Sequence, residues 1–176
     1  GMTFTDFEGN LLAGQILLNV SLDIQSFQVI EGGNASTTTG DLSLTIDSRT
    51  QPETTITTLG NSLTTITDLS TDTVSDFLTA VTEDTSVFPR AFTTDATGRV
   101  SSSEFNGFVT YDTPTPFESS GDSFPYDGEM LIFGTNNSNV RIIAMDEENV
   151  RIEADYDGDG ASDATIDTTW EALVGS

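Results

Sequence analysis

Apolar and polar residues alternate regularly between residues 18 and 24, where Leu, Val, Leu and Ile are each separated by a polar residue. A two-residue period is typical of a β-strand with one buried face. The alternation shifts at Gln25 and resumes at Phe27, which predicts a β-bulge between them. Residues 42–47 repeat the pattern. The polar, Gly-containing segment 31–40 is therefore expected to connect two strands.

The middle of the chain continues as short strand-like segments rich in Thr. Gly60 is followed by Asn61 between two such segments, and this dipeptide predicts a tight hairpin because Gly supplies a positive φ. Residues 74–82, 87–94 and 99–111 are predicted strands, separated by expected turns at 83–84 and 95–98. The first of them also fits helical spacing, but we favour a strand because the composition is rich in Thr.

Residues 113–128 interrupt this rhythm with several Pro, Gly and aromatic residues. A connection of this length is expected to be an ordered loop or to carry function. Its aromatic residues Phe117, Phe124 and Tyr126 are expected to cap the open end of a barrel or sandwich. The alternative is that they bind a glycan or a protein ligand.

The last third predicts a regular meander of strands over 129–134, 140–145, 150–155 and 164–170. A three-residue loop from Glu147 to Asn149 aligns the apolar positions of the second strand with those of the third and places Asn149 in a left-handed conformation. We expect this register to set Arg141 across from Asp155. Trp170 is expected to be a large core or edge anchor.

These patterns predict an all-β, antiparallel fold of roughly ten strands closing into a barrel or sandwich. We expect one domain over residues 1–176. The alternative is an N-terminal β unit, 1–112, and a C-terminal β meander, 113–176.

The charge of the chain is strongly acidic, with 29 Asp and Glu residues against five basic residues and a formal net charge of −24. Such a surface repels phosphate backbones and anionic lipids, which argues against nucleic-acid binding and against membrane binding or insertion. The chain has no Cys and no His, so a His-based triad and the usual zinc sites are excluded. We therefore expect a protein that is not an enzyme.

The segment from Asp155 to Asp163 carries Asp at its first, third, fifth and last positions, with glycines between them. Ca²⁺ prefers six to eight oxygen ligands, and alternate carboxylates on a tightly curled loop converge on one point. We predict calcium binding by Asp155, Asp157, Asp159 and the Ala161 carbonyl, with Asp163 completing the shell directly or through water. The alternative is an acidic turn that remains hydrated.

This loop resembles the calcium loops of EF-hands, dockerins and the integrin-type repeats of β-propellers. It departs from the EF-hand pattern at the twelfth position, where Ile166 replaces a bidentate Glu, and the integrin-type loop is more similar. The departure implies weak affinity, with a Kd of roughly 10⁻⁴–10⁻³ M. The chain from Ser102 onwards, in which Thr168-Thr169-Trp170 follows the loop, is similar to uncharacterised secreted proteins and lipoproteins of marine gammaproteobacteria.

We expect a secreted, periplasmic or outer-surface lipoprotein, and Gly1 before Met2 is typical of a remnant of tag removal after a lost signal segment. The preferred function is a structural or binding module whose C-terminal hairpin is stabilised by calcium. A lipocalin-like barrel, with a cavity covered by residues 117–126, is the first alternative. A glycan-active enzyme that uses paired carboxylates is the second.

Overall fold

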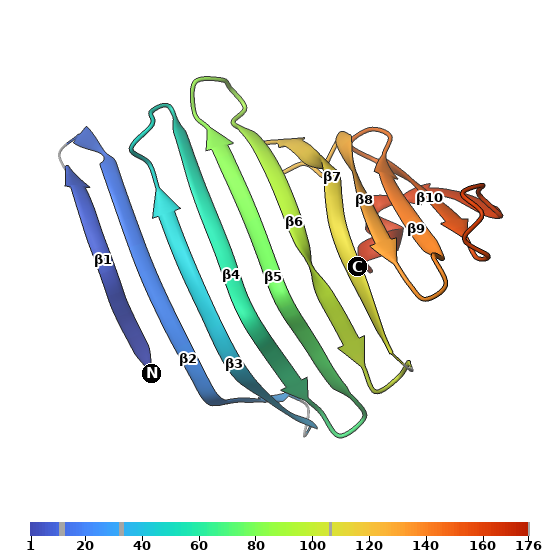
Figure 1. Ribbon diagram of the computed structural model, residues 1–176. Helices are drawn as coiled ribbons and strands as arrows, with labels where there is room; N and C mark the ends of the chain where they lie inside the picture. Colours follow the sequence, from blue (N-terminus) through green and yellow to red (C-terminus); the bar gives the residue numbers. More distant parts are fainter. Residues whose placement is uncertain (11–12, 32–33, 106, 176) are drawn as a thin grey trace.

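The computed structural model describes residues 1–10, 13–31, 34–105 and 107–175, and it consists of one antiparallel sheet followed by a short helix (Figure 1). The strand order follows the chain, so each strand pairs only with its neighbours in sequence. The elements are β1 (Met2–Asn10), β2 (Gln15–Glu31), β3 (Asn34–Asp47), β4 (Glu53–Ile66), β5 (Thr71–Asp84), β6 (Ala91–Ser102), β7 (Phe108–Ser120), β8 (Asp127–Phe133), β9 (Asn139–Ala144), β10 (Asn149–Asp155), β11 (Ala164–Thr169) and α1 (Trp170–Val174). The predicted all-β antiparallel meander is confirmed.

The sheet is not closed into a barrel. β1 and β11 lie at opposite ends of the strand order, and Figure 1 shows the long strands β1 to β6 side by side, followed by the shorter strands β8 to β11. β7 pairs with both β6 and β8, so the sheet continues across the expected boundary at residue 113. The division into two units stays a prediction. No described helix is long and apolar enough to cross a membrane.

The alternating pattern produces a sheet with two different faces. Cross-strand partners share a face, and one row of partners across β2 to β7 is largely apolar. That row consists of Leu18, Ile46, Ile56, Val81, Thr94 and Phe117. The next row lies on the opposite face and consists of Leu17, Asp47, Thr55, Thr82, Thr93 and Glu118. We call these the apolar face and the polar face.

Irregular positions run in a line across the long strands. The strand register shifts between Ile24 and Phe27, Gly40 and Ser43, Ser75 and Leu78, Thr94 and Thr97, and Asp112 and Thr115. The first of these confirms the predicted bulge. Each bulge bends its strand and increases its local twist, so the line marks a bend that crosses the sheet.

Two glycines on this line are required because neighbouring groups lie against their backbone: an aromatic ring at each of them and, at Gly60, also the carbonyl oxygen of Asp41 at 2.4 Å from an added Cβ. A Cβ added at Gly60 would lie 2.5 Å from Cζ of Phe77, and one at Gly98 would lie 2.6 Å from Oη of Tyr111. Gly60 itself pairs with Phe77 inside continuous strands. The predicted hairpin at Gly60 and Asn61 is therefore wrong, as are the predicted turns at 83–84 and 95–98, which lie inside β5 and β6. The glycines make room for rings and bulges rather than for turns.

Three further sequence predictions are corrected by the strand boundaries. Residues 34–40 of the expected connection belong to β3, where Thr38 bonds to Thr65 (Oγ1 to Oγ1, 3.0 Å); residues 32 and 33 lie outside the described part. The segment 99–111, predicted as one strand, contains the turn between β6 and β7. The expected long loop 113–128 is mostly strand, because β7 accommodates its prolines where its pairing with β8 is irregular. The segment 74–82 is a strand, as predicted.

The C-terminal meander has strands close to the predicted ones, but the register of β9 against β10 differs from its prediction. Ala144 pairs with Val150 and Ile142 with Ile152, so the apolar positions share a face as predicted. The predicted three-residue loop is wrong, however, because residues 145–148 connect the strands and the observed register is offset by two residues from the predicted one. The observed register sets Arg141 opposite Glu153 and Asn139 opposite Asp155, and the expected pairing of Arg141 with Asp155 is wrong. Asn149 begins β10 and does not have a positive φ. The turn is held instead by the Asp146 carboxylate, which accepts hydrogen bonds from the backbone N of Glu148 and of Asn149 (2.9 and 2.8 Å).

The core of this part lies beneath α1, a helix that the sequence patterns did not predict. Trp170 is 7% exposed and packs with Ala144 and Val150, against which Phe117 and Ile142 also lie. Its indole Nε1 donates to the carbonyl oxygen of Pro125 at 2.9 Å. The helix begins at this residue because the Thr169 hydroxyl accepts a hydrogen bond from the backbone N of Ala172. The expected role of Trp170 as a core anchor agrees with this packing.

Candidate metal centre

The acidic loop connects β10 to β11 and is closed at its base by the sheet. Ala154 pairs with Ala164 as the last partners of the two strands, and the backbone N of Asp163 donates to the carbonyl oxygen of Ala154 at 2.8 Å. Asp155 is therefore the last residue of β10. The loop residues 156–163 extend beyond a hairpin whose strands hold its two ends together.

Asp155 organises the loop from its buried end. Its side chain is only 5% exposed, and its Oδ1 accepts a hydrogen bond from the backbone N of Gly158 at 2.7 Å. Its Oδ2 accepts bonds from the backbone N of Gly160 at 2.9 Å and from Nδ2 of Asn139 at 3.2 Å. Gly158 and Gly160 have φ values of 76° and 88°, in the left-handed region that favours glycine. The chain therefore curls around the Asp155 carboxylate.

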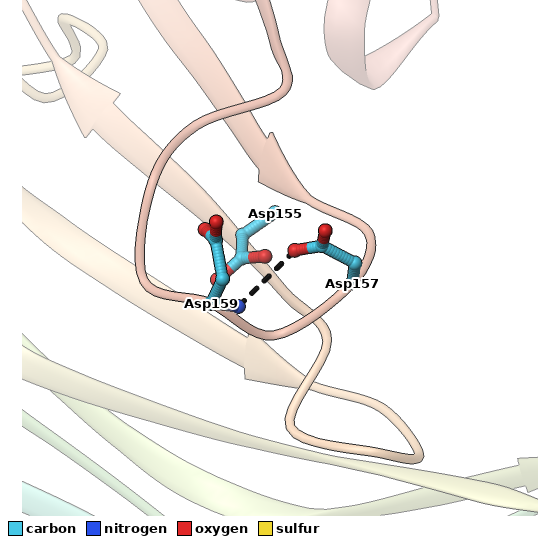
Figure 2. A group of neighbouring side chains, drawn as sticks. All are labelled: Asp155, Asp157 and Asp159. Carbon is cyan, nitrogen blue, oxygen red and sulfur yellow. Dashed lines mark hydrogen bonds between the residues drawn. The ribbon is translucent and has the colours of Figure 1, made fainter.

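The curl brings the carboxylates of Asp155, Asp157 and Asp159 together (Figure 2). One carboxylate oxygen from each lies within 4.8 Å of the others. Two oxygens bound to one Ca²⁺ ion at 2.3–2.6 Å are at most about 5 Å apart, so this spacing fits a shared ion. Asp157 Oδ1 also accepts from the backbone N of Asp159 at 3.2 Å, and Asp159 Oδ1 from that of Ala161 at 2.8 Å. Each carboxylate retains further lone pairs for a ligand.

The two remaining predicted ligands have other contacts. The Asp163 carboxylate accepts a hydrogen bond from the backbone N of Tyr156 at 2.7 Å, and it is not among the three that converge. Ala161 contributes its backbone N to the Asp159 carboxylate. The structure thus brings together the first three predicted carboxylates, whereas coordination by Asp163 and by the Ala161 carbonyl stays a prediction.

Asn139 is the site residue that the sequence reasoning missed. It stands on β9 as the cross-strand partner of Asp155, and its amide orients that carboxylate. The apolar positions of the two strands determine which residues share a face but not the offset between the strands, and the observed offset places Asn139, and not Arg141, opposite Asp155. An amide there holds the carboxylate without neutralising its charge.

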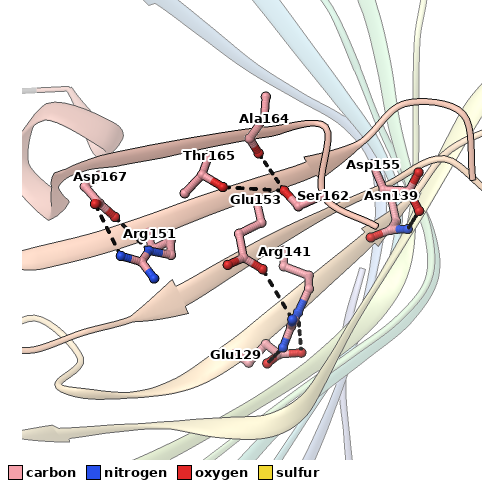
Figure 3. A network of polar contacts seen from close by, with 10 residues as sticks. All are labelled: Glu129, Asn139, Arg141, Arg151, Glu153, Asp155, Ser162, Ala164, Thr165 and Asp167. Carbon is pink, nitrogen blue, oxygen red and sulfur yellow. Dashed lines mark hydrogen bonds and ion pairs between the residues drawn. The ribbon is translucent and has the colours of Figure 1, made fainter. Parts of the chain in front are cut away.

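The arginines near the loop are engaged elsewhere (Figure 3). Arg141 pairs with Glu129 at 2.5 Å and with Glu153 at 3.3 Å, and the hydrogen bond with Glu129 raises the pKa of the guanidinium. Arg151 pairs with Asp167 at 2.8 Å, which lowers the pKa of that carboxyl. Arg49, Arg90 and Arg99 contact groups in the long strands. Within the described residues, no arginine forms an ion pair with the converging carboxylates.

The aromatic residues of the expected ligand site pack mainly within the protein. Phe117 meets the Trp170 ring edge-on with centroids 5.9 Å apart, and Phe124 stacks on it at 6.2 Å. The Tyr126 hydroxyl donates to Glu118 Oε2 at 3.3 Å, and burial together with the Glu118 charge raises the pKa of Tyr126. These rings are therefore accounted for by the core around α1, and a glycan or protein ligand there stays a prediction.

Comparisons of the chain with models of protein families, with characterised proteins and with solved structures found no match.

Proposed function

We propose that the protein is a non-enzymatic structural or binding module whose C-terminal hairpin is stabilised by Ca²⁺ in the loop between β10 and β11. The proposal rests on one observation, the convergence of the Asp155, Asp157 and Asp159 carboxylates within 4.8 Å. Asp163, through water or directly, and the Ala161 carbonyl complete the proposed ligand set. We place the protein outside the cytoplasm, in a secreted, periplasmic or surface lipoprotein form, where calcium is abundant and a weak site is filled.

The charge distribution supports a cation at this position. Three carboxylates held this close repel one another, and the described arginines pair with other groups. The backbone N–H groups of Gly158 and Gly160 offset part of the charge on Asp155. Asp157 and Asp159 are exposed to solvent. A divalent ion between them relieves the repulsion and joins the tip of the loop to its buried base.

The stabilisation follows from mass action. An ion that binds only the folded chain stabilises it by RT ln(1 + [L]/Kd). With the Kd of about 10⁻⁴–10⁻³ M expected for such a loop, calcium at ten to a hundred times Kd contributes about 1.4 to 2.7 kcal/mol. The folded module is thus more stable where calcium is abundant and less stable where calcium is scarce.

A ligand-binding barrel is the second candidate, and one observation favours it. An apolar hollow with a volume of about 370 Å³ opens on the apolar face, lined by Val100, Phe105, Val109, Tyr111, Met130 and Ile132. A lipocalin-like site also needs a closed sheet, which the open strand order does not provide, and Phe117 and Phe124 contact Trp170 instead of covering a cavity. The glycan-active enzyme has no comparable observation in its favour among the described residues.

The calcium proposal is tested by following the melting temperature and the heat of binding during a calcium titration. We expect millimolar Ca²⁺ to raise the Tm of the wild-type protein and the Asp157→Asn variant to lose most of that rise. Asparagine keeps an acceptor for the backbone N of Asp159 and removes the charge, so the loop hydrogen bond survives. Asp122→Asn, which removes an exposed charge from the β7–β8 loop, is the matched control and should respond like the wild type.

Two results would contradict the calcium proposal. The first is a wild-type Tm that does not change with calcium and a titration without binding heat. The second is an equal calcium response in Asp157→Asn and in the wild type, which would assign the effect to general screening of the acidic surface.

A further inference from the structure

Apart from its Phe117 end, which packs against Trp170, the apolar face of the long strands has no second layer over it among the described elements. Ile56 is 39% exposed at the middle of its row, and Phe27 and Val29 are 61% and 44% exposed further along β2. Beyond the line of bulges, a second apolar row consists of Ile24, Gly40, Leu63, Val74, Val100 and Val109. β-sheets with one apolar face are stable when that face is packed against another layer. The face is therefore incomplete in the single chain.

Both rows lie on the same face, so the uncovered surface is continuous. Phe77 has the same orientation as Val81 in β5, and a Cβ added at Gly98 would touch both Phe77 and Tyr111. Tyr111 in turn lines the hollow with Val100 and Val109. The apolar surface thus extends from the row at Ile56, past the bulges, to the hollow between β6, β7 and β8.

The exposed area is too large for a compact chain of this mass. The surface accessible to solvent is 10808 Å², whereas a folded monomer of 18.8 kDa exposes about 8,300 Å² by the usual scaling with mass. The excess of about 2,500 Å² exceeds the 800 Å² or so that each partner buries in a standard interface. It falls within the range that each subunit of an obligate homodimer buries.

Charge selects the face on which two copies can meet. The described carboxylates on the polar face of β2 to β7 include Asp23, Asp41, Asp47, Glu53, Asp84, Asp95, Asp112 and Glu118. On the apolar face of these strands, the described side chains include two carboxylates. Glu83 is paired with Arg90, and Asp72 is held by the hydroxyls of Ser70 and Ser102. Both lie near the ends of β5. Two copies therefore repel through their polar faces and can approach through their apolar faces.

We propose that a second copy of this chain covers the apolar face, so that two sheets pack face to face as a sandwich around a two-fold axis. Paired sheets pack about 10 Å apart with interdigitated side chains, and a two-fold axis lets the same surface serve both partners. A lipid bilayer is a poorer occupant because a chain of formal charge −24 is repelled by anionic headgroups. The inference goes beyond the calcium site and does not depend on it.

The test is the mass of the protein in solution with a matched pair of variants on β4. Ile56 on the apolar face and Leu59 on the polar face are 39% and 42% exposed, so aspartate at either position removes a similar side chain from a similar environment. We expect sedimentation equilibrium in about 1 M salt, where the screening length is about 3 Å, to give twice 18.8 kDa for the wild type. Ile56→Asp should reduce this mass to that of one chain, and Leu59→Asp should leave it unchanged.

A second measurement remains informative if Ile56→Asp fails to fold. The chain has no Cys, so a single spin label can be attached at Thr58→Cys on the apolar face or at Thr57→Cys on the polar face. We expect the dipolar coupling between copies to be stronger for the label at 58 than for the label at 57. A wild-type mass of one chain at every concentration tested would overturn the proposal. So would loss of the dimer in Leu59→Asp alone, or stronger coupling at 57.

Discussion

Trp170 offers the most direct test of how α1 is attached to the sheet. Its ring is 7% exposed, and a buried tryptophan hides roughly 150–250 Å², which corresponds to about 4–6 kcal/mol at 25 cal/mol per Å². Truncations of this kind usually cost 3–5 kcal/mol because the site partly collapses. We therefore expect Trp170→Ala to lower the free energy of unfolding by about 3–5 kcal/mol. The loss of structure should be greatest in β8 to β11.

Intermediate variants separate the contributions to this loss. Trp170→Phe keeps an aromatic ring between Phe117 and Phe124 but removes the donor to Pro125, so we expect it to cost about 1–3 kcal/mol. Leu173→Ala, on the same helix and 38% exposed, is the control and should cost less than 1 kcal/mol or so. Urea unfolding monitored by far-UV circular dichroism measures all three. A cost below about 1 kcal/mol for Trp170→Ala would refute the view that this ring anchors the C-terminal core.

Two more predictions address the long strands. Gly60→Ala places a methyl group 2.4 Å from the carbonyl oxygen of Asp41 and 2.5 Å from the Phe77 ring, so we expect a loss of about 1–3 kcal/mol that Phe77→Leu relieves only in part. A urea-unfolding double-mutant cycle without coupling would contradict the ring-over-glycine packing. The hydrogen bonds from the Arg49 side chain and backbone lower the pKa of Asp47 from 3.8 to about 2, so its stabilising effect is complete above about pH 4 and is lost as the pH falls toward 2. The urea midpoints of wild type and Asp47→Asn should therefore converge over that range, and a constant difference would argue against this pair.

The strands and faces of the C-terminal third were predicted better than those of the rest because apolar and polar residues alternate more regularly there. Ile142 and Ile152 share a face in every register that is shifted by an even number of residues, so the pattern determined the faces but not the offset. The predicted three-residue loop led to a register two residues away from the observed one. In the long strands, Thr occupies both faces, and Gly60 and Gly98 are consistent with turns as well as with bulges. Only the rings of Phe77 and Tyr111, supplied by neighbouring strands, decide between these readings. Such tertiary contacts cannot be read from local spacing.

The residues of the candidate site also differ in how far local spacing predicts them. The spacing of Asp155, Asp157 and Asp159 within one loop was sufficient to predict their convergence, because the loop is local and its glycines permit the curl. Asn139 depends on the pairing of a different strand, and its contribution became visible only with the register of β9 against β10. Helix α1 was missed because five residues are too few for a periodic signal.

The strand order has a consequence for how the molecule acquires its shape. Since every strand adds beside the one just before it, no pairing requires the distant ends of the chain to find each other. Loop-closure entropy therefore stays small at each step, and the sheet can assemble by successive zippering, as stacked repeats do. Such a molecule can lengthen or shorten by whole hairpins at its N-terminal end during evolution without disturbing the region around Trp170.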